Sequence, residues 1–345
     1  MASRPGWWVA LAGVLAVVLV AVGVGVAVAM SADRPPAGAE QSTAPSASPS
    51  STPASDPAPV SVRPERRVMA TCDELVPAAA EFGFVDATDV AVIEDEPSIV
   101  AVQAGQLECA WSAPWLADQA ISLHVIPDAA PLGDVDEEMS GPRCSTGAGV
   151  SCGHPVEAPF FAYIWVQFAD DMTLDAANAA FDTILESARV GLASATILPR
   201  LDMPRTLVPG VMSALDFATV GPMFGLTSGA GATPGWPQEF LGSTASDVVG
   251  VEYAAWGDSD GGAWVQAQVI PGAGWAVDEL LAQAGVHAPL EVAGFGVAAS
   301  RIGSHSVCGA VGVDLVCVWG YAGEPDVLGG GAFERGVAQF VAMLS

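Results

Sequence analysis

Residues 107–127 of the chain read LECAWSAPWLADQAISLHVIP, and residues 248–271 read VVGVEYAAWGDSDGGAWVQAQVIP. Both segments alternate apolar residues with small or polar ones around a central turn, and both end in Val-Ile-Pro. Alternation with a period of two is typical of a strand with one buried face, and the Asp and Gly residues at 258–262 favour a tight turn. Each segment therefore predicts a β-hairpin. The expected strands are 107–113, 119–126, 248–256 and 263–270.

Other landmarks recur in the same order around the two hairpins, which indicates an internal repeat. Leu75-Val76-Pro77 returns at residues 207–209, and Ala180-Phe181-Asp182 returns as Ala332-Phe333-Glu334. Two matched pairs of tryptophans follow the same order, and we expect all four in the protein core. These pairs are Trp111 with Trp256 and Trp165 with Trp319.

The repeat divides the folded part into two copies, residues 69–199 and residues 200–345. The offset between matched landmarks grows from 132 to 152 residues, so the second copy is the longer one. Insertions fall in loops. The Gly- and Pro-rich stretch at residues 229–244 is therefore the expected place of the first insertion.

Each copy has the pattern of an α+β domain. A short helix after Cys72 or Arg205 leads to the hairpin, and a further strand region follows at residues 160–168 or 307–319. A closing helix ends each copy, with apolar residues at helical spacing on one face. Those residues are Leu174, Ala177, Phe181, Ile184, Leu185 and Ala188, and then Phe333, Val337, Phe340, Val341 and Leu344. We expect two tandem copies of a small antiparallel sheet with helices packed on one face.

Residues 7–30, WWVALAGVLAVVLVAVGVGVAVAM, contain no charged side chain. At ~1.5 Å per residue a helix of this length reaches roughly 36 Å, which spans a hydrocarbon core of about 30 Å. The segment predicts a transmembrane helix, and Arg4 favours a cytoplasmic tail at residues 1–6. The alternative is a cleaved signal peptide, because Ala27-Val28-Ala29 is a small-x-small pattern. We expect a single-pass protein of the cell membrane, with most of the chain extracytoplasmic.

Residues 31–68 have the composition of a linker. They hold eight Pro, eight Ser and seven Ala, without Leu, Ile, Met or any aromatic residue. Such a segment buries too little apolar surface to fold, so it predicts a disordered tether. Arg63, Arg66 and Arg67 at its end suggest either a processing site or a solvated boundary.

The charge of the chain excludes several classes of protein. All eleven basic residues are Arg, so a Schiff-base lysine and a Gly-Lys phosphate loop are absent. Residues 69–345 carry six Arg against 35 acidic residues, a net charge of −29. Nucleic-acid binding needs a basic surface and is disfavoured. The acidity is consistent with a soluble, well-dispersed extracytoplasmic part.

The six cysteines are expected to form disulfides, as is common in exported proteins. Cys72 and Cys109 both lack a counterpart in the second copy, and their joint absence suggests that they bond to each other. Cys308 and Cys317 flank a predicted turn at Gly312-Val313. The third pair is then Cys144 with Cys152, although six cysteines allow fifteen connectivities.

The exported part has no His-Glu-x-x-His and no Gly-x-Gly-x-x-Gly. Gly-x-Ser-x-Gly occurs at residues 149–153 and 257–261. A nucleophile elbow needs this serine between a strand and a helix, whereas the two matches fall in a Gly-rich loop that carries Cys152 and in the predicted hairpin turn. We expect no cofactor and no metal. His154 beside Cys144 and Cys152 imitates a zinc cluster, and Asp258-x-Asp260 imitates the start of a calcium loop, but a disulfide and a hairpin turn account for them. Acidic clusters at residues 94–96 and 134–138 indicate either a solvated surface or catalytic carboxylates.

Three short motifs resemble a known family. Cys72-x-x-Leu75, Cys109-x-Trp111 and Gly294-Phe-Gly296-x-x-Ala299 resemble an actinobacterial family of secreted domains of unknown function, commonly lipoproteins. The second copy lacks the first cysteine pair, and no cysteine precedes Cys72 for lipid attachment. The resemblance implies an envelope-facing binding or accessory domain and supplies no catalytic residues.

These patterns favour a tethered, non-catalytic binding or sensing module of the cell envelope, and the alternative is an envelope hydrolase that uses acidic residues. The expected partner is a cell-wall ligand or an envelope protein. Trp236, Trp264 and Trp275 have no counterpart among the matched tryptophans, and aromatic faces suit sugar rings and peptide side chains. We therefore expect them to contact a ligand, in the second copy or in the cleft between the copies.

Overall fold

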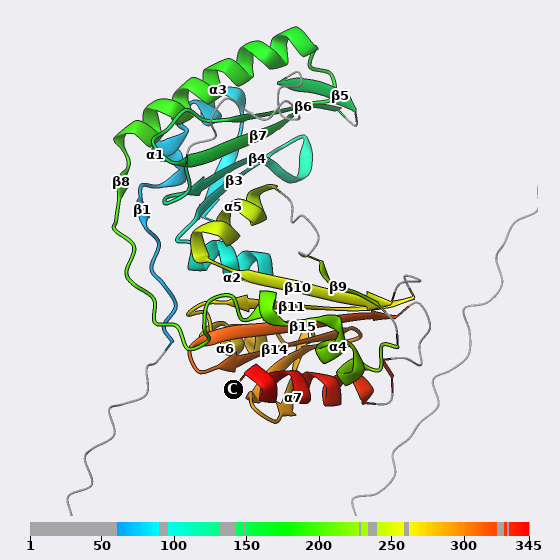
Figure 1. Cartoon of the computed structure of the whole chain (residues 1–345). Helices are drawn as coiled ribbons and strands as arrows, with labels where there is room; N and C mark the ends of the chain where they lie inside the picture. The colour runs from blue at the N-terminus through cyan, green and yellow to red at the C-terminus, as the bar shows by residue number, and fades with distance from the viewer. Residues whose placement is uncertain are drawn as a thin grey trace, which may run out of the picture. The chain divides into compact units, whose positions relative to one another are not determined.

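The computed structural model describes residues 61–89, 96–130, 143–147, 149–227, 229–233, 240–258, 262–322, 328–329 and 331–344 (Figure 1). All of them belong to one compact unit, Pro57–Ser345. The predicted membrane helix at residues 7–30 lies outside the described residues, as does the tether up to residue 60. Within the described ranges, no helix is long and apolar enough to cross a membrane.

Two antiparallel sheets form the framework. The six-stranded sheet has the order β2-β3-β4-β7-β6-β5. Its strands are β2 (Val85–Asp89), β3 (Leu107–Ala113), β4 (Leu116–Ile126), β5 (Cys144–Gly147), β6 (Gly149–Pro155) and β7 (Phe161–Phe168). The seven-stranded sheet has the order β9-β10-β11-β15-β14-β13-β12. Its strands are β9 (Gly229–Thr233), β10 (Glu252–Asp258), β11 (Ala263–Ile270), β12 (His287–Val292), β13 (Gly296–Arg301), β14 (His305–Val311) and β15 (Asp314–Ala322).

The two sheets follow the same strand order, apart from the extra edge strand β12. Their registers match as well. Trp111 lies opposite Ile121, and the next residue, Ser122, lies opposite Trp165. In the second sheet Trp256 lies opposite Val265, and Gln266 lies opposite Trp319. The landmarks matched in the sequence therefore occupy equivalent places in the two sheets.

A closing helix covers the outer face of each sheet, as expected. Helix α3 (Leu174–Ser194) buries Phe181 and Ile184 in the same core as Trp111. Helix α7 (Ala332–Leu344) buries Phe340, whose ring packs edge-on against Trp256 with a centroid distance of 5.8 Å. The apolar faces read from the helical spacing are thus the faces that are buried.

The expectation that all four matched tryptophans lie in the core is wrong for one pair. Trp111 and Trp256 are 2% and 0% exposed. Trp165 and Trp319 are only half-buried, because their strand positions place them on the opposite face of each sheet. Ile164 and Val166, the neighbours of Trp165, are the residues that join the core under α3.

Helices pack on both faces of the sheets, not on one face as expected. Helices α2 (Glu96–Gln103) and α5 (Phe240–Val249) lie side by side between the two sheets (Figure 1). With α6 (Ala276–Ala282) they form a third apolar cluster, which includes Ile126 of the first sheet and Leu315 of the second. Helix α2 has no clear apolar stripe in its sequence EPSIVAVQ, so helical spacing gave no signal for it.

The sequence also misplaced one strand and one insertion. The strand expected from residue 248 begins at Glu252, because Val248 and Val249 end α5 and Gly250 follows with φ 76°. The extra residues of the second copy do not lie at residues 229–244, which hold β9 and the start of α5. They precede β9. Leu75 lies 10 residues before β2, whereas Leu207 lies 22 residues before β9.

Short helices fill the start of each copy, as predicted after Cys72 and Arg205. The first copy has α1 (Cys72–Leu75) and the 3-10 helix η1 (Pro77–Phe82). The second has η3 (Met212–Ala214), α4 (Phe217–Val220) and η4 (Gly221–Phe224). A two-stranded ladder of β1 (Val68–Met69) and β8 (Thr196–Ile197) places the start of the first copy beside its end.

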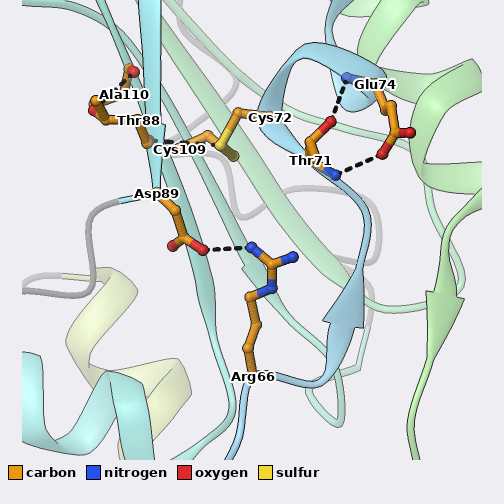
Figure 2. Close-up of a disulfide and its surroundings, with 8 residues drawn as sticks. All are labelled: Arg66, Thr71, Cys72, Glu74, Thr88, Asp89, Cys109 and Ala110. Atoms are coloured by element: carbon orange, nitrogen blue, oxygen red, sulfur yellow. Dashed lines mark hydrogen bonds and ion pairs between the residues drawn. A yellow bond between two sulfur atoms is a disulfide. The ribbon is translucent and has the colours of Figure 1, made fainter.

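The three disulfides have the pairing expected from the sequence. Cys72–Cys109 joins the first residue of α1 to β3, beside the capping box of Thr71 and Glu74 (Figure 2). The other two disulfides, Cys144–Cys152 and Cys308–Cys317, link residues directly opposite each other in hairpins. The turn between β14 and β15 is Gly312-Val313, as the spacing predicted.

We predict that removing the long-range disulfide costs more stability than removing a hairpin disulfide. Cys72–Cys109 spans 37 residues and Cys308–Cys317 spans 9. The chain-entropy model gives about 3.8 and about 2.6 kcal/mol for loops of these lengths. Chemical denaturation of the C72A/C109A and C308A/C317A variants measures both losses. A larger loss from the hairpin pair would contradict the prediction.

The two core tryptophans provide a second test of the packing. Trp256 Nε1 donates to the carbonyl oxygen of Leu215 at 3.1 Å, whereas Trp111 Nε1 is buried with no partner in the described part of the chain. Replacing Trp256 with Phe should therefore lower the free energy of unfolding by about 1 kcal/mol more than replacing Trp111 with Phe. Parallel denaturation curves of W256F and W111F measure the difference. Equal losses would show that the indole hydrogen bond contributes nothing.

Candidate functional site

A pocket of about 130 Å³ lies where residues 63–66 cross the inner side of the first copy. Residues 61–67 are called the N-terminal segment below. The pocket walls come from this segment, from α2 and the turn after it, and from β2 and β3. The lining residues are Arg63, Pro64, Arg66, Asp89, Ser98, Ala101, Val102, Gly105, Gln106 and Glu108.

The two carboxylates of the pocket come from neighbouring strands. Asp89, the last residue of β2, lies opposite Cys109 in β3, and Glu108 is the residue before Cys109. The turn after α2 contains Gly105 with φ 70°, and a Cβ there would lie 2.5 Å from the Cδ atom of Arg67. Glycine is therefore required for the N-terminal segment to pass this turn.

The three arginines of the N-terminal segment are paired, contrary to the idea of a solvated boundary. Arg66 is hydrogen-bonded to Asp89 (Figure 2), and Arg63 donates to Glu279 of α6 at 2.8 Å. Arg67 is 8% exposed and donates from Nη2 to Asp128 at 2.9 Å. The segment is thereby attached to both halves of the fold.

Glu108 faces a neutral histidine. His124 lies directly opposite in β4, with Nδ1 3.8 Å from Glu108 Oε2. Burial lowers the pKa of His124 to about 4, so the ring is uncharged at neutral pH. The Gln106 amide lies 3.2 Å from the same Nδ1, and its N–H group donates to that nitrogen. Nδ1 is then an acceptor and gives Glu108 no proton.

Burial raises the pKa of Glu108, and the negative charge of Asp89 raises it further. Both effects oppose ionisation, because the charged carboxylate has lost water and lies near a like charge. Among the described residues, Glu108 is paired only with His124, and that ring is uncharged. Glu108 therefore has no cationic partner there. A carboxylate with a raised pKa in a pocket is a candidate for ligand binding or for proton transfer.

The equivalent position in the second copy is chemically different. Tyr253 lies opposite Gln268 at the register place held by Glu108 and His124. The Tyr253 hydroxyl lies 2.8 Å from Ser246 Oγ of α5, and Gln268 donates to it at 3.3 Å. This uncharged network links the second sheet to α5. The first copy has a carboxylate and an open pocket at the same place.

Two of the three predicted ligand-binding tryptophans, Trp264 and Trp275, lie among the described residues, near opposite ends of β11. Trp236 lies outside the described residues. Trp264, at the start of β11, stacks on Tyr321 with ring centroids 5.9 Å apart. Trp275 follows the other end of β11. That Trp264 and Trp275 contact a ligand stays a prediction.

Trp275 takes part in the attachment of the N-terminal segment. Its backbone N–H donates to Ser61 Oγ at 3.0 Å, and the guanidinium of Arg63 lies over its ring, 5.7 Å from the centroid. Its indole Nε1 donates to Gln103 Oε1 at 3.0 Å. Trp275 thus lies next to the pocket, one contact away through Arg63.

The pocket has only a weak signal in the sequence. Glu108 and His124 occupy the polar positions of the first hairpin, where solvent-facing residues are expected. The acidic cluster at residues 134–138 lies outside the described residues, as do residues 94 and 95 of the other cluster. Only the meeting of the N-terminal segment, α2 and β3 shows that the carboxylates line a pocket.

Neither metal alternative gains support from the geometry. Cys144 and Cys152 are bonded to each other, so they are not thiolate ligands for zinc beside His154. Asp258 ends β10, and residues 259–261 lie outside the described residues. Among the residues that the structure describes, no group of three or more His, Cys, Asp or Glu side chains is arranged to hold a metal ion.

Comparisons with protein-family models, with curated proteins and with solved structures find no match to this chain. The pocket therefore has to be interpreted from its own chemistry.

The low pKa of His124 predicts acid sensitivity. His124 has a pKa of about 4 in the folded chain against 6.5 for an ordinary histidine. The unfolded chain therefore takes up its proton first, so stability present above pH 6.5 is lost as the pH falls towards 4, by at most about 3 kcal/mol.

The matched variant is His124→Asn, whose Oδ1 can replace Nδ1 as the acceptor for Gln106. The difference in the free energy of unfolding between the wild type and H124N should shrink as the pH falls from 6.5 to 4. Urea denaturation at several pH values measures it. A difference that stays constant with pH would show that His124 is not held neutral.

Proposed function

We propose that the chain is a membrane-anchored, extracytoplasmic binding or sensing module of the cell envelope, without catalytic activity. The ligand occupies the pocket beneath the N-terminal segment. Residues 7–30 act as the single-pass anchor, and residues 31–60 act as a spacer. Three disulfides favour an oxidising compartment outside the cytoplasm. The resemblance of three short motifs to secreted actinobacterial domains, stated from the sequence, agrees with this location.

The proposal is based on the fact that the pocket is lined both by the N-terminal segment and by the folded body. Arg63, Pro64 and Arg66 form one side, and they directly continue the tether that leads to the predicted anchor. Gln106 and Glu108 belong to the folded body. A bound ligand therefore touches both the tether and the body, which links occupancy of the pocket to the way in which the body is held at the membrane.

The contacts of the N-terminal segment suit such a link. Ser61 Oγ donates to the carbonyl oxygen of Gly272 at 2.7 Å, and Arg63 reaches Glu279, so the segment starts on the second copy. Arg66 and Arg67 then reach Asp89 and Asp128 on the first copy. The Arg63 and Arg66 pairs are partly exposed and each contributes little, so a ligand can strengthen or displace them, whereas Arg67 is nearly buried and holds the end of the segment in place.

We also propose that residues 69–199 and residues 200–345 are diverged copies of one α+β domain. The shared strand order, the matched register of the tryptophans and the closing helices support it. In this proposal the two copies pack through α2 and α5. The polar pocket belongs to the first copy, where the equivalent of the neutral Tyr253 network has become Glu108 and His124.

One observation favours the alternative of an envelope hydrolase with acidic residues. Glu108 has a raised pKa and lies near Asp89, and a protonated carboxylic acid beside an ionised carboxylate is the arrangement of a general acid and its partner. The Asp89 carboxylate is hydrogen-bonded to Arg66, so it is not free to act as the second catalytic carboxylate. Binding is therefore the better-supported function.

A ligand screen on the full-length protein in lipid nanodiscs tests the proposal. Soluble cell-wall fragments should raise the melting temperature of the wild type and of Glu81→Gln, an exposed carboxylate on η1. Glu108→Gln should lose the shift, and without ligand its melting temperature should be no lower than that of the wild type, because the substitution removes a partly buried charge. The fragments should be recovered unchanged.

Two outcomes would reject parts of this proposal. Cleavage of a fragment by the wild type but not by E108Q would establish the hydrolase instead. A shift that is equal in E108Q and the wild type would place binding elsewhere, and the stacked Trp264 and Tyr321 would be the next surface to test.

A further inference from the structure

The charges that line the pocket are unevenly satisfied. Arg63 is paired with Glu279, and Arg66 is paired with Asp89. Glu108 alone among these groups faces an uncharged neighbour, His124, at 3.8 Å, and its side chain is only 28% exposed. Of the charged groups of the pocket that the structure describes, Glu108 is therefore the one that lacks an opposite charge.

The fold itself does not need a carboxylate at this place. The second copy holds the same register position with Tyr253 and Gln268, which satisfy each other and Ser246 without any charge. Burying part of a carboxylate without a partner costs free energy, and an ion pair offsets much of that cost. A cation supplied from outside the chain would restore the charge balance at this place.

The other walls limit the form of that cation. Pro64, Ala101 and Val102 provide aliphatic surface next to Glu108, and Ser98 and Gln106 provide polar atoms. A volume of about 130 Å³ is well below the ~300–1,000 Å³ of sites for drug-sized molecules. The space therefore fits one end of a molecule, with a short apolar stem and a charged tip.

We propose that this pocket binds a primary ammonium group carried on a short aliphatic chain, with Glu108 as its counter-ion and Pro64, Ala101 and Val102 packed along the chain. The inference rests on the proposed binding function and names the chemical class of the ligand. A free diamine and the side chain of a lysine-type residue in a peptide share this chemistry. An anionic ligand would have to break the Arg63 or Arg66 ion pair, which makes it the less favourable occupant.

Calorimetric titration of the full-length protein in nanodiscs tests the ligand class. The probes are 1,5-diaminopentane and Nα-acetyl-lysinamide, and the neutral control is Nα,Nε-diacetyl-lysinamide. We expect both amines to bind and the control to bind at least tenfold more weakly. Tighter binding of the diamine points to a free diamine as the source, and tighter binding of the lysinamide points to a peptide.

Three variants locate the binding. Glu108→Gln should weaken the binding of both amines at least tenfold, Glu108→Asp should recover part of it because the charge returns, and Glu81→Gln should leave it within twofold of the wild type. Recovery by E108D separates a counter-ion from a residue that only keeps the fold. Near-UV circular dichroism of each variant checks that the core is intact.

Several results would overturn the inference and are distinguishable from failure of the proposed function. Equal binding of the diacetylated control, or an unchanged affinity in E108Q, rejects the ammonium site. If the amines do not bind but wall fragments still shift the melting temperature through Glu108, the ligand class is wrong and the binding function stands. If neither amines nor wall fragments bind, both fail.

Discussion

A sheet that is apolar on both faces must be covered on both faces, and this constraint organises the folded part of the chain. The outer faces carry Trp111 and Trp256, which are buried under α3 and α7. The inner faces are buried against α2, α5 and α6 in one shared apolar cluster. Gln103, almost fully buried there, donates to the carbonyl oxygen of Pro271 and accepts from the Trp275 indole. Its amide thus satisfies polar groups that the apolar layer would otherwise leave unpaired.

The inner face is also where the two sheets differ most. Tyr253 and Gln268 form a closed, neutral network with α5, while Glu108 and His124 sit at the same register with an unbalanced charge. The strand scaffold tolerates both because these positions alternate with the core positions under α3 and α7. A change in residue type there alters the chemistry of the inner face without disturbing the outer core.

The N-terminal segment forms part of this inner face and contacts both halves of the fold. Its arginines reach acidic residues on both halves of the fold, which is consistent with the strongly acidic character of residues 69–345. The same segment forms a wall of the pocket, so a molecule in the pocket would touch side chains that attach the segment to the rest of the fold. The proposed sensing role is based on this sharing.

The sequence alone predicted the two hairpins and the apolar faces of the closing helices, and it suggested the pairing of the cysteines that the structure shows. These features depend on short-range periodicity and on direct cross-strand register, as in Cys308–Cys317. The tertiary structure alone decided the burial of α2 and α5, the position of Trp165 on the inner face of its sheet and the pairing of Arg67. Those features depend on which distant segments meet. Glu108 reads as a surface residue in its strand, and only the crossing of the N-terminal segment makes it part of a pocket.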